Sequence, residues 1–327
     1  MSYILRRLAF FAVTLWAAMT INFFLPRMMP GNPAEAMMAR VHGRINPDAL
    51  RALEVAFGIN THDSLIVQYF QYLGDVARGQ FGTSIYFFPT SVSYLLGQAL
   101  PWTLGLVGIT TVLAFILGTL VGMVAAWLRG GVTDSLLPPI FVVLSALPFF
   151  WLGLIFIWLF SDILGWLPGA EAYDMGSTIS LSWSFLGQVL QHGFLPGLTL
   201  LLVSVGGWIL TMRNNMITVL AEDYVRMARA KGLSPLRIML LYAGRNAILP
   251  NLTGFAMSLG FVVSGAILIE IVFSYPGLGY YLYQAVTGED YPLMQAIFLL
   301  ITVAVLVAVL VSDALTALLD PRTRERQ

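Results

Sequence analysis

Six long apolar stretches constrain what this chain can fold into. None of them contains Asp, Glu, Lys or Arg, and they lie at about 8–26, 101–128, 136–160, 194–212, 247–269 and 292–312. A helix that crosses the hydrocarbon core of a bilayer needs roughly 20 apolar residues, so each stretch predicts one transmembrane helix. Charged residues make up only 10% of the 327 residues, whereas soluble proteins carry about 25%. The expected fold is an all-α polytopic membrane protein with six transmembrane helices.

The rest of the composition excludes several classes of function. A formal net charge of zero argues against a nucleic-acid partner, which would require a basic surface. The chain has no cysteine, which excludes disulfides and thiolate metal sites. We expect surface or loop positions for the scattered His42, His62 and His192, because a zinc site needs convergent ligands. The sequence contains no evident catalytic set and predicts neither an enzyme nor a bound cofactor or metal.

Basic residues predict the orientation in the membrane, because cytoplasmic loops carry an excess of Lys and Arg. The first span is expected to be a retained anchor, since its apolar run is longer than the roughly 7–15 residues of a signal peptide. With both termini in the cytoplasm, the inner segments hold 12 of the 17 basic residues, namely Arg6, Arg7, Arg129, Arg213, Arg226, Arg229, Lys231, Arg237, Arg245, Arg322, Arg324 and Arg326. Arg213 and Arg245 are expected to be little more than topology markers.

The long outer segment between the first two spans is predicted to have structure of its own. Asp48 to Phe57 and Ser64 to Val76 have the apolar spacing of amphipathic helices, which could lie at the outer surface or pack on the spans as a lid. The predicted division is therefore an N-terminal end with the first span (1–28), an extracytoplasmic segment (29–100), a five-helix core (101–319) and a cytoplasmic tail (320–327). The last two spans of the core extend to 247–273 and 292–319.

Small residues and prolines within the spans predict details of packing. Gly118 and Gly122 form a small-xxx-small pattern that allows a neighbouring helix to approach closely. Pro138, Pro139 and Pro148 are expected to bend the third span, because proline removes a backbone donor and clashes with the preceding turn.

The cytoplasmic stretch EDYVRMARAKGLSPLR (222–237) concentrates charge between two apolar spans. Asp223 is predicted to cap a helix that begins at Tyr224, and Gly232 suits the left-handed position that ends it. Ser234 followed by Pro235 is typical of the start of a further helix. A two-turn helix is unstable alone in water, so it must pack on something. We interpret it as a docking element, although the arginines could serve only as topology markers.

A second candidate site lies between the last two spans. Glu270 is the only acid at the edge of a span interior; such a residue is a functional candidate, but it could also brace the turn at 274–279. Pro276 and the glycines Gly277 and Gly279 predict a turn in which the glycines adopt positive φ or allow close backbone contact. We expect this outer hairpin (270–295) to help form an outer gate.

Several motifs together resemble a known family. The stretch EDYVRMARAKGLSPLRIMLLYAGRNAILP (222–250) is similar to the cytoplasmic motif of bacterial ABC-importer permeases of the dipeptide/oligopeptide/nickel branch. PGNPAE (30–35), FGTS (81–84) and EIVFSYPGLGYYLYQAVTGEDYPLMQ (270–295) also resemble motifs of this branch. The general importer motif begins Glu-Ala-Ala, whereas this chain has Arg226-Met227-Ala228. The likeness spans almost the whole chain and implies the first permease subunit, in the bacterial inner (cytoplasmic) membrane.

The resemblance also implies partners and site residues. The partners would be a second, homologous permease, two ATP-binding subunits or domains that carry ATP and magnesium, and an extracytoplasmic solute-binding protein. The only lysine, Lys231, is followed by glycine and does not fit a phosphate-binding loop, so energy must come from another subunit. The implied ATPase-coupling residues are Asp223, Tyr224, Arg226, Ala228, Arg229, Ala230, Lys231, Gly232 and Ser234, and the gate residues are Glu270, Pro276, Gly277 and Gly279.

The sequence leaves more than one substrate and more than one class of transporter open. Within the branch, peptides are favoured over oligosaccharides, for which Trp166, Tyr173 and Trp183 could provide stacking surfaces, and nickel chelates come third. An ion-coupled secondary transporter that acts without an ATPase is the competing hypothesis. It would require intramembrane carboxylates and an inverted repeat, and the sequence shows neither clearly. A membrane-embedded enzyme would need converging polar residues within the spans.

Overall fold

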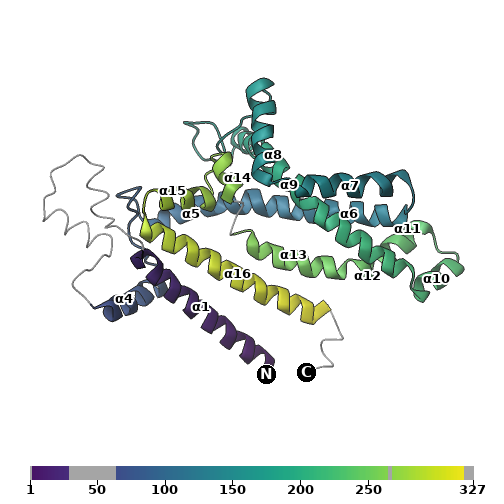
Figure 1. The fold of residues 1–327 in the computed structure, drawn as a ribbon, viewed down its shortest axis with the longest axis horizontal. Coiled ribbons are helices and arrows are strands. Elements are labelled where there is room, and N and C mark those ends of the chain that lie inside the picture. Colours follow the sequence, from purple (N-terminus) through teal and green to yellow (C-terminus); the bar gives the residue numbers. More distant parts are fainter. Residues whose placement is uncertain (1, 29–63, 264–266, 320–327) are drawn as a thin grey trace. The chain divides into compact units, whose positions relative to one another are not determined.

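The computed structural model describes residues 2–28, 64–263 and 267–319. In these ranges the chain is helical, with one isolated bridge between Thr83 and Ser91 and no strand (Figure 1). The predicted all-α class is therefore confirmed. The chain divides into two compact units, which are described separately: residues 1–103, 263–267 and 276–307 form the first, and residues 104–262, 268–275 and 308–327 the second.

The first unit is built around an apolar core between three helices. Its helices are α1 (Ser2–Met28), α4 (Leu65–Ala77), α5 (Val92–Thr103), α15 (Leu278–Thr287) and the first part of α16 (Tyr291–Leu319). The core lies between α5, α15 and α16 and contains Val92, Leu95, Leu96, Ala99, Leu278, Leu282, Ala285, Leu293 and Ile297. Helices in a bilayer are held together mainly by close packing and hydrogen bonds, so the packing of these side chains makes the three helices one body and fixes α15 within it.

The predicted helix at 64–76 is confirmed as α4, and it packs on α1. The ring of Tyr69 meets that of Phe23 edge-on at 5.2 Å, and its hydroxyl hydrogen-bonds that of Thr20 at 2.7 Å. These contacts favour a helix that packs on a span over one that only lies at the surface. The other expected helix, at 48–57, lies outside the described residues.

The second unit contains the remaining helices and is organised around the longest one, α9. It comprises η1 (Leu104–Gly108), α6 (Ile109–Trp127), α7 (Val132–Ala146), α8 (Phe149–Phe156), η2 (Ile157–Ile163), α9 (Trp183–Leu220), α10 (Asp223–Ala230), α11 (Pro235–Arg237), η3 (Ile238–Gly244), α12 (Arg245–Ala247), α13 (Leu249–Phe261) and α14 (Ile267–Val272), of which the first residue is assigned to the first unit.

The glycines of α6 allow close packing on α9, as the small-xxx-small pattern predicts. A Cβ added at Gly118 would lie 2.4 Å from Cβ of Trp208, and one added at Gly122 would lie 2.5 Å from the carbonyl oxygen of Ile209. Both distances are far below van der Waals contact, so the two backbones meet where only glycine fits. This contact fixes the relative position of α6 and α9, whose ends pack on α10.

The count of six spans remains a prediction. Within the described residues, three helices are long and apolar enough to cross a membrane: Val92–Trp127, Trp183–Leu220 and Tyr291–Val311. A bent pair, Asp134–Ala146 with Phe149–Ile163, makes a fourth if it counts as one span. The first expected span falls within α1, of which a shorter part (Ala9–Phe24) is apolar, and the fifth includes residues 264–266, which lie outside the described residues.

The third expected span is broken at Pro148. Leu147 has ψ 135°, Pro148 precedes the first residue of α8, and the helices on either side meet at 95°. A residue before proline is driven out of the helical region by the proline ring, which explains the break. At the two other prolines of this span, Pro138 and Pro139, helix α7 continues. The expected bend is therefore confirmed at Pro148, where it is sharper than a kink.

Candidate functional site

Helix α10, on the loop predicted to be cytoplasmic, begins one residue earlier than the sequence predicts. The first helical hydrogen bonds run from the N–H groups of Val225 and Arg226 to the carbonyl of Glu222, at 3.1 and 3.2 Å. Glu222 is therefore the N-cap, and the prediction of Asp223 as the cap was wrong. The carboxylate of Asp223 instead lies in the first turn, where it pairs with Arg226 at 3.4 Å. Negative charge is favourable there because it complements the helix dipole.

The C-terminal end of α10 has the predicted glycine stop. Gly232 has φ +71°, its N–H donates to the carbonyl of Arg229 at 2.9 Å, and the N–H of Leu233 donates to that of Ala228 at 3.3 Å. This pair of bonds is a Schellman motif, which satisfies the last carbonyls of the helix. The next helix, α11, begins at Pro235 as predicted, although the hydroxyl of its N-cap, Ser234, makes no capping bond.

Apolar packing anchors α10 to the rest of the second unit. Val225 and Ala228 are 0% and 2% exposed. They share a cluster with residues from the ends of α6 and α9 and from the segment that follows α10, namely Met123, Ala126, Met212, Met216, Ile238, Ala243 and Ala247. Figure 1 shows α10 at the end of α9, beside α11. A displacement of α10 would therefore also displace the helices on which it packs.

Two polar contacts supplement this packing. Nδ2 of Asn246 donates to the hydroxyl of Tyr224 at 2.8 Å, which joins the start of α10 to α12. The guanidinium of Arg229 lies 5.9 Å from the ring centre of Trp127 at the end of α6. A cation over an aromatic face at this distance is weakly attractive, by about 0.5–1 kcal/mol at exposed sites.

The outward face of α10 mixes apolar and basic side chains. Of the predicted coupling residues, Ala228 is buried against this chain's own helices, and the others are exposed. Sequence reasoning missed Met227 and Leu236, whose side chains are 60% and 62% exposed. Two large apolar residues on a charged loop between membrane spans were the available signal. Partially apolar, partially basic surfaces of this kind suit contact with another protein.

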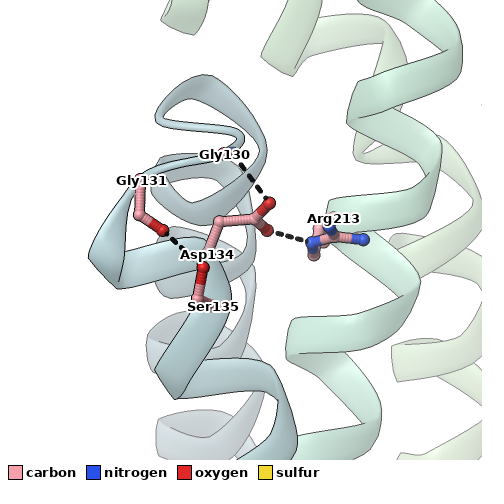
Figure 2. A network of polar contacts seen from close by, with 5 residues as sticks. All are labelled: Gly130, Gly131, Asp134, Ser135 and Arg213. Carbon is pink, nitrogen blue, oxygen red and sulfur yellow. Dashed lines mark hydrogen bonds and ion pairs between the residues drawn. The ribbon is translucent and has the colours of Figure 1, made fainter.

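A polar network ties the turn between α6 and α7 to α9 (Figure 2). Nε of Arg213 donates to one carboxylate oxygen of Asp134 at 2.5 Å, and the N–H of Gly130 donates to the other at 3.1 Å. The Arg213 and Asp134 side chains are 23% and 10% exposed. The interpretation of Arg213 as little more than a topology marker was therefore wrong, because the side chain holds α9 to the start of α7.

The end of α14, at the outer hairpin, closes in the same way as α10 but with serine in place of glycine. The N–H of Ser274 donates to the carbonyl of Ile271 at 3.1 Å, and that of Tyr275 donates to the carbonyl of Glu270 at 2.8 Å. Ser274 has φ +48°, a conformation that costs a non-glycine residue roughly 1–2 kcal/mol. The residue Glu270 is fully buried, and its carbonyl closes this turn.

The glycines of the hairpin do not adopt the predicted positive φ. Gly277 has φ −92° and ψ 179° and is the N-cap of α15, while Gly279 is buried within that helix. The alternative of left-handed glycines was wrong, because the strained position falls three residues before Gly277, at Ser274; the other alternative, close backbone contact, stays a prediction. Pro276 precedes this cap, and the N–H of Leu278 donates to the hydroxyl of Thr103 at 2.8 Å. This bond fixes the start of α15 to the end of α5.

His192 also departs from the expectation of a surface or loop position. It lies in α9 and is 8% exposed. Its Nδ1 is 2.8 Å from the carbonyl oxygen of Ala170, and its Nε2 is 3.1 Å from Asp174. The connection after η2 folds back over α9 and covers the ring. His42 and His62 lie outside the described residues, and among those described no group of three or more His, Asp or Glu side chains could hold a metal.

The fold and this site define a multi-pass helical membrane protein in which the short helix α10 is anchored by two buried residues and exposes its other side chains. Residues 118–325 match the model of the binding-protein-dependent transport system inner membrane component, and residues 1–90 match the model of the N-terminal part of such components. The chain therefore belongs to the family of binding-protein-dependent transport system inner membrane components.

Curated relatives match from end to end. The chain is 35% identical to the di/tripeptide transport system permease protein of Pseudomonas aeruginosa, and the match covers 100% of both chains. It is 32% identical to the oligopeptide transport system permease protein of Bacillus subtilis, over 98% of both chains. It is also 33% identical to the glutathione transport system permease protein of Salmonella typhimurium, over 99% of both.

These matches settle the class of function. The chain is an inner-membrane permease subunit of an ABC importer, not an enzyme, and the ion-coupled secondary transporter is not favoured. Permeases of such systems act together with ATP-binding and solute-binding components, so the general partners implied by the resemblance are supported.

Proposed function

We propose that this chain forms half of the translocation path of a peptide importer and receives the energy of ATP hydrolysis through α10. The observation that carries the proposal is the construction of α10. The helix is too short to be stable alone, yet two buried residues, Val225 and Ala228, fix it to three other segments. Its remaining side chains face outward. A rigid attachment with a free outer face is what a force-transmitting contact requires.

The substrate class follows from the relatives. The names of three of them specify di- and tripeptides, oligopeptides and glutathione, all of which contain peptide bonds. We therefore propose a short peptide as the substrate, ahead of an oligosaccharide or a nickel chelate. Selection would take place mainly on the extracytoplasmic binding protein that delivers the peptide.

The assembly follows from the same reasoning. This chain would pair with a second, homologous permease to enclose a path wide enough for a peptide. Two ATP-binding subunits, which carry ATP and magnesium, would dock on the two cytoplasmic faces. Both termini would lie in the cytoplasm, and the bilayer would surround the spans. The outer hairpin, with Glu270, Pro276, Gly277 and Gly279, would form part of the outer gate.

The mechanical step can be described from contacts within the second unit. Closure of the ATP-binding subunits would displace α10. Because Val225 and Ala228 share an apolar cluster with Met216 of α9 and Ile238 of η3, those helices would move with it. Protein interiors are closely packed and transmit displacement. The glycine contact between α6 and α9 would carry the motion further into the membrane.

Uptake by the reconstituted complex tests the proposal. We expect proteoliposomes that contain both permeases and the ATP-binding subunits to accumulate a labelled tripeptide only with ATP and the binding protein. The isolated chain should transport nothing, because it has no means of its own to use ATP. Uptake by the isolated chain driven by a proton gradient would contradict the proposal, and transport of a maltooligosaccharide but no peptide would contradict the substrate class.

A further inference from the structure

One sequence motif that the proposed function does not use, FGTS, meets the outer hairpin in the first unit at Asp290. The motif FGTS (81–84) precedes α5, and Asp290 lies in the turn between α15 and α16. The side chains of Ser84 and Asp290 are both fully buried, and the Ser84 hydroxyl donates to the carboxylate across 206 positions of sequence. A fully buried aspartate is uncommon unless it is paired or hydrogen-bonded, so this contact calls for an explanation.

Both carboxylate oxygens of Asp290 are occupied by donors of this chain. Oδ2 accepts hydrogen bonds from the Ser84 hydroxyl and from the N–H of Tyr86, the latter at 3.1 Å. Oδ1 accepts from the N–H of Leu293 at 3.2 Å and so caps the start of α16. The Ser84 oxygen in turn accepts from the N–H of Phe87 at 2.9 Å. The arrangement offsets the cost of burying a carboxylate and consists of neutral donors from two separate segments.

The two segments that meet here are each internally ordered. The loop at 82–91 is closed by a bond from the N–H of Ser84 to the carbonyl of Thr90, at 2.9 Å. The turn after α15 is closed by a bond from the N–H of Asp290 to the carbonyl of Ala285, at 2.8 Å. A Cβ added at Gly288 would lie 2.4 Å from the ring of Tyr86, so the loop and the turn also touch through close packing. Two rigid pieces are thus joined by a short polar bridge.

We propose that Asp290 is a positioning residue that fastens α15 to the loop at 82–91, so that α15 of the outer hairpin and this loop move as one piece during transport. The inference rests on the proposed role of this hairpin as an outer gate. A gate that opens and closes must keep its orientation, and two hydrogen bonds from the loop to one buried carboxylate provide a fixed point close to the end of α15.

The test uses spin labels and needs no transport activity for its first readout. The chain has no cysteine, so Phe88→Cys and Tyr283→Cys can be labelled alone; both side chains are well exposed, and they lie on the loop and on α15. In the assembled complex we expect one narrow distance distribution that does not change when ATP binds. Adding Ser84→Ala or Asp290→Asn should broaden this distance distribution, whereas with Ser84→Thr, which keeps the hydroxyl, the distribution should stay narrow.

Asp290→Asn is informative because an amide cannot replace the carboxylate. Whichever way the amide is turned, its NH₂ group faces the N–H of either Tyr86 or Leu293. In proteoliposomes, Ser84→Ala and Asp290→Asn should lower peptide uptake per ATP hydrolysed several-fold, a ratio that does not depend on the amount of folded complex. Ser93→Ala, on an exposed serine of α5, should leave it unchanged.

Two results would overturn the proposal: a label distance that shifts with ATP in the unsubstituted complex, or a distribution that stays narrow in Ser84→Ala and Asp290→Asn. Failure of the proposed function is a separate result, since an unsubstituted complex without ATP-driven uptake would still report on the joint through the label distance.

Discussion

Replacing Gly232 by valine is expected to uncouple ATP hydrolysis from uptake. Gly232 has φ +71° and an added Cβ would meet nothing within 4 Å, so the penalty comes from the backbone conformation alone. It should be about 1–2 kcal/mol, which corresponds to roughly a five- to thirtyfold change in an equilibrium. The chain would leave the Schellman geometry, and the direction of α11 after α10 would change. We expect peptide uptake per ATP hydrolysed to fall several-fold, with normal insertion of the complex.

The control for this variant is Gly176→Val. Gly176 has φ +86° and open space around it. It lies on the connection between η2 and α9, which is predicted to be on the extracytoplasmic side of the membrane. Its backbone penalty should be similar, so both variants should lose similar thermal stability. The uptake-to-ATP ratio should remain normal in Gly176→Val. Equal ratios in the two variants would mean that the segment at 222–237 only marks topology.

Replacing Gly122 by alanine is expected to destabilise the complex, although alanine normally favours a helix. The added Cβ would lie 2.5 Å from the carbonyl oxygen of Ile209 and 2.9 Å from Cβ of Met212. Overpacking of this kind costs about 1–3 kcal/mol, which exceeds the helix-propensity gain of roughly 0.5–1 kcal/mol. We therefore expect a lower midpoint in thermal unfolding of the purified complex in lipid nanodiscs.

Gly207→Ala, in the partner helix α9, is expected to have the opposite effect on the unfolding midpoint. Gly207 lies in α9, and an added Cβ there would meet nothing within 4 Å. Only the propensity gain remains, so stability should stay the same or rise. If both alanine variants shifted the midpoint in the same direction and by the same amount, the close contact between α6 and α9 would not exist in the membrane.

The features that sequence reasoning predicted are local ones. Gly232 ends α10 where its neighbours indicate, because a glycine after a short amphipathic helix and a proline three residues later are signals within one turn. The cap at the other end was misplaced by one residue, since Glu222 and Asp223 are both acidic and adjacent. The glycine pair of α6 was also predicted, because small residues four apart lie on one helix face.

The features that sequence reasoning missed depend on distant partners. Asp134 and Arg213 are 79 residues apart, and Ser84 and Asp290 are 206 apart. At such separations no local sequence pattern indicates that the two side chains are in contact. His192 was misjudged for the same reason, because the backbone that covers it has no periodic pattern. In the outer hairpin the residue with left-handed backbone is Ser274. Its place is set by where α14 ends, not by where the glycines lie in the sequence.

Cross-linking from α10 tests the central claim most directly. A cysteine introduced at Met227, which is exposed on α10, can be labelled with a photoactivatable maleimide in the purified, otherwise cysteine-free chain before the partners are added. Val132→Cys, exposed at the start of α7, is the matched control on another predicted cytoplasmic turn. We expect illumination of the assembled complex to join position 227 to the ATP-binding subunit, in a yield that changes with ATP, and to give little product from position 132. An equal yield from both positions, or none from position 227, would contradict the assignment of α10 as the site where ATP hydrolysis drives transport.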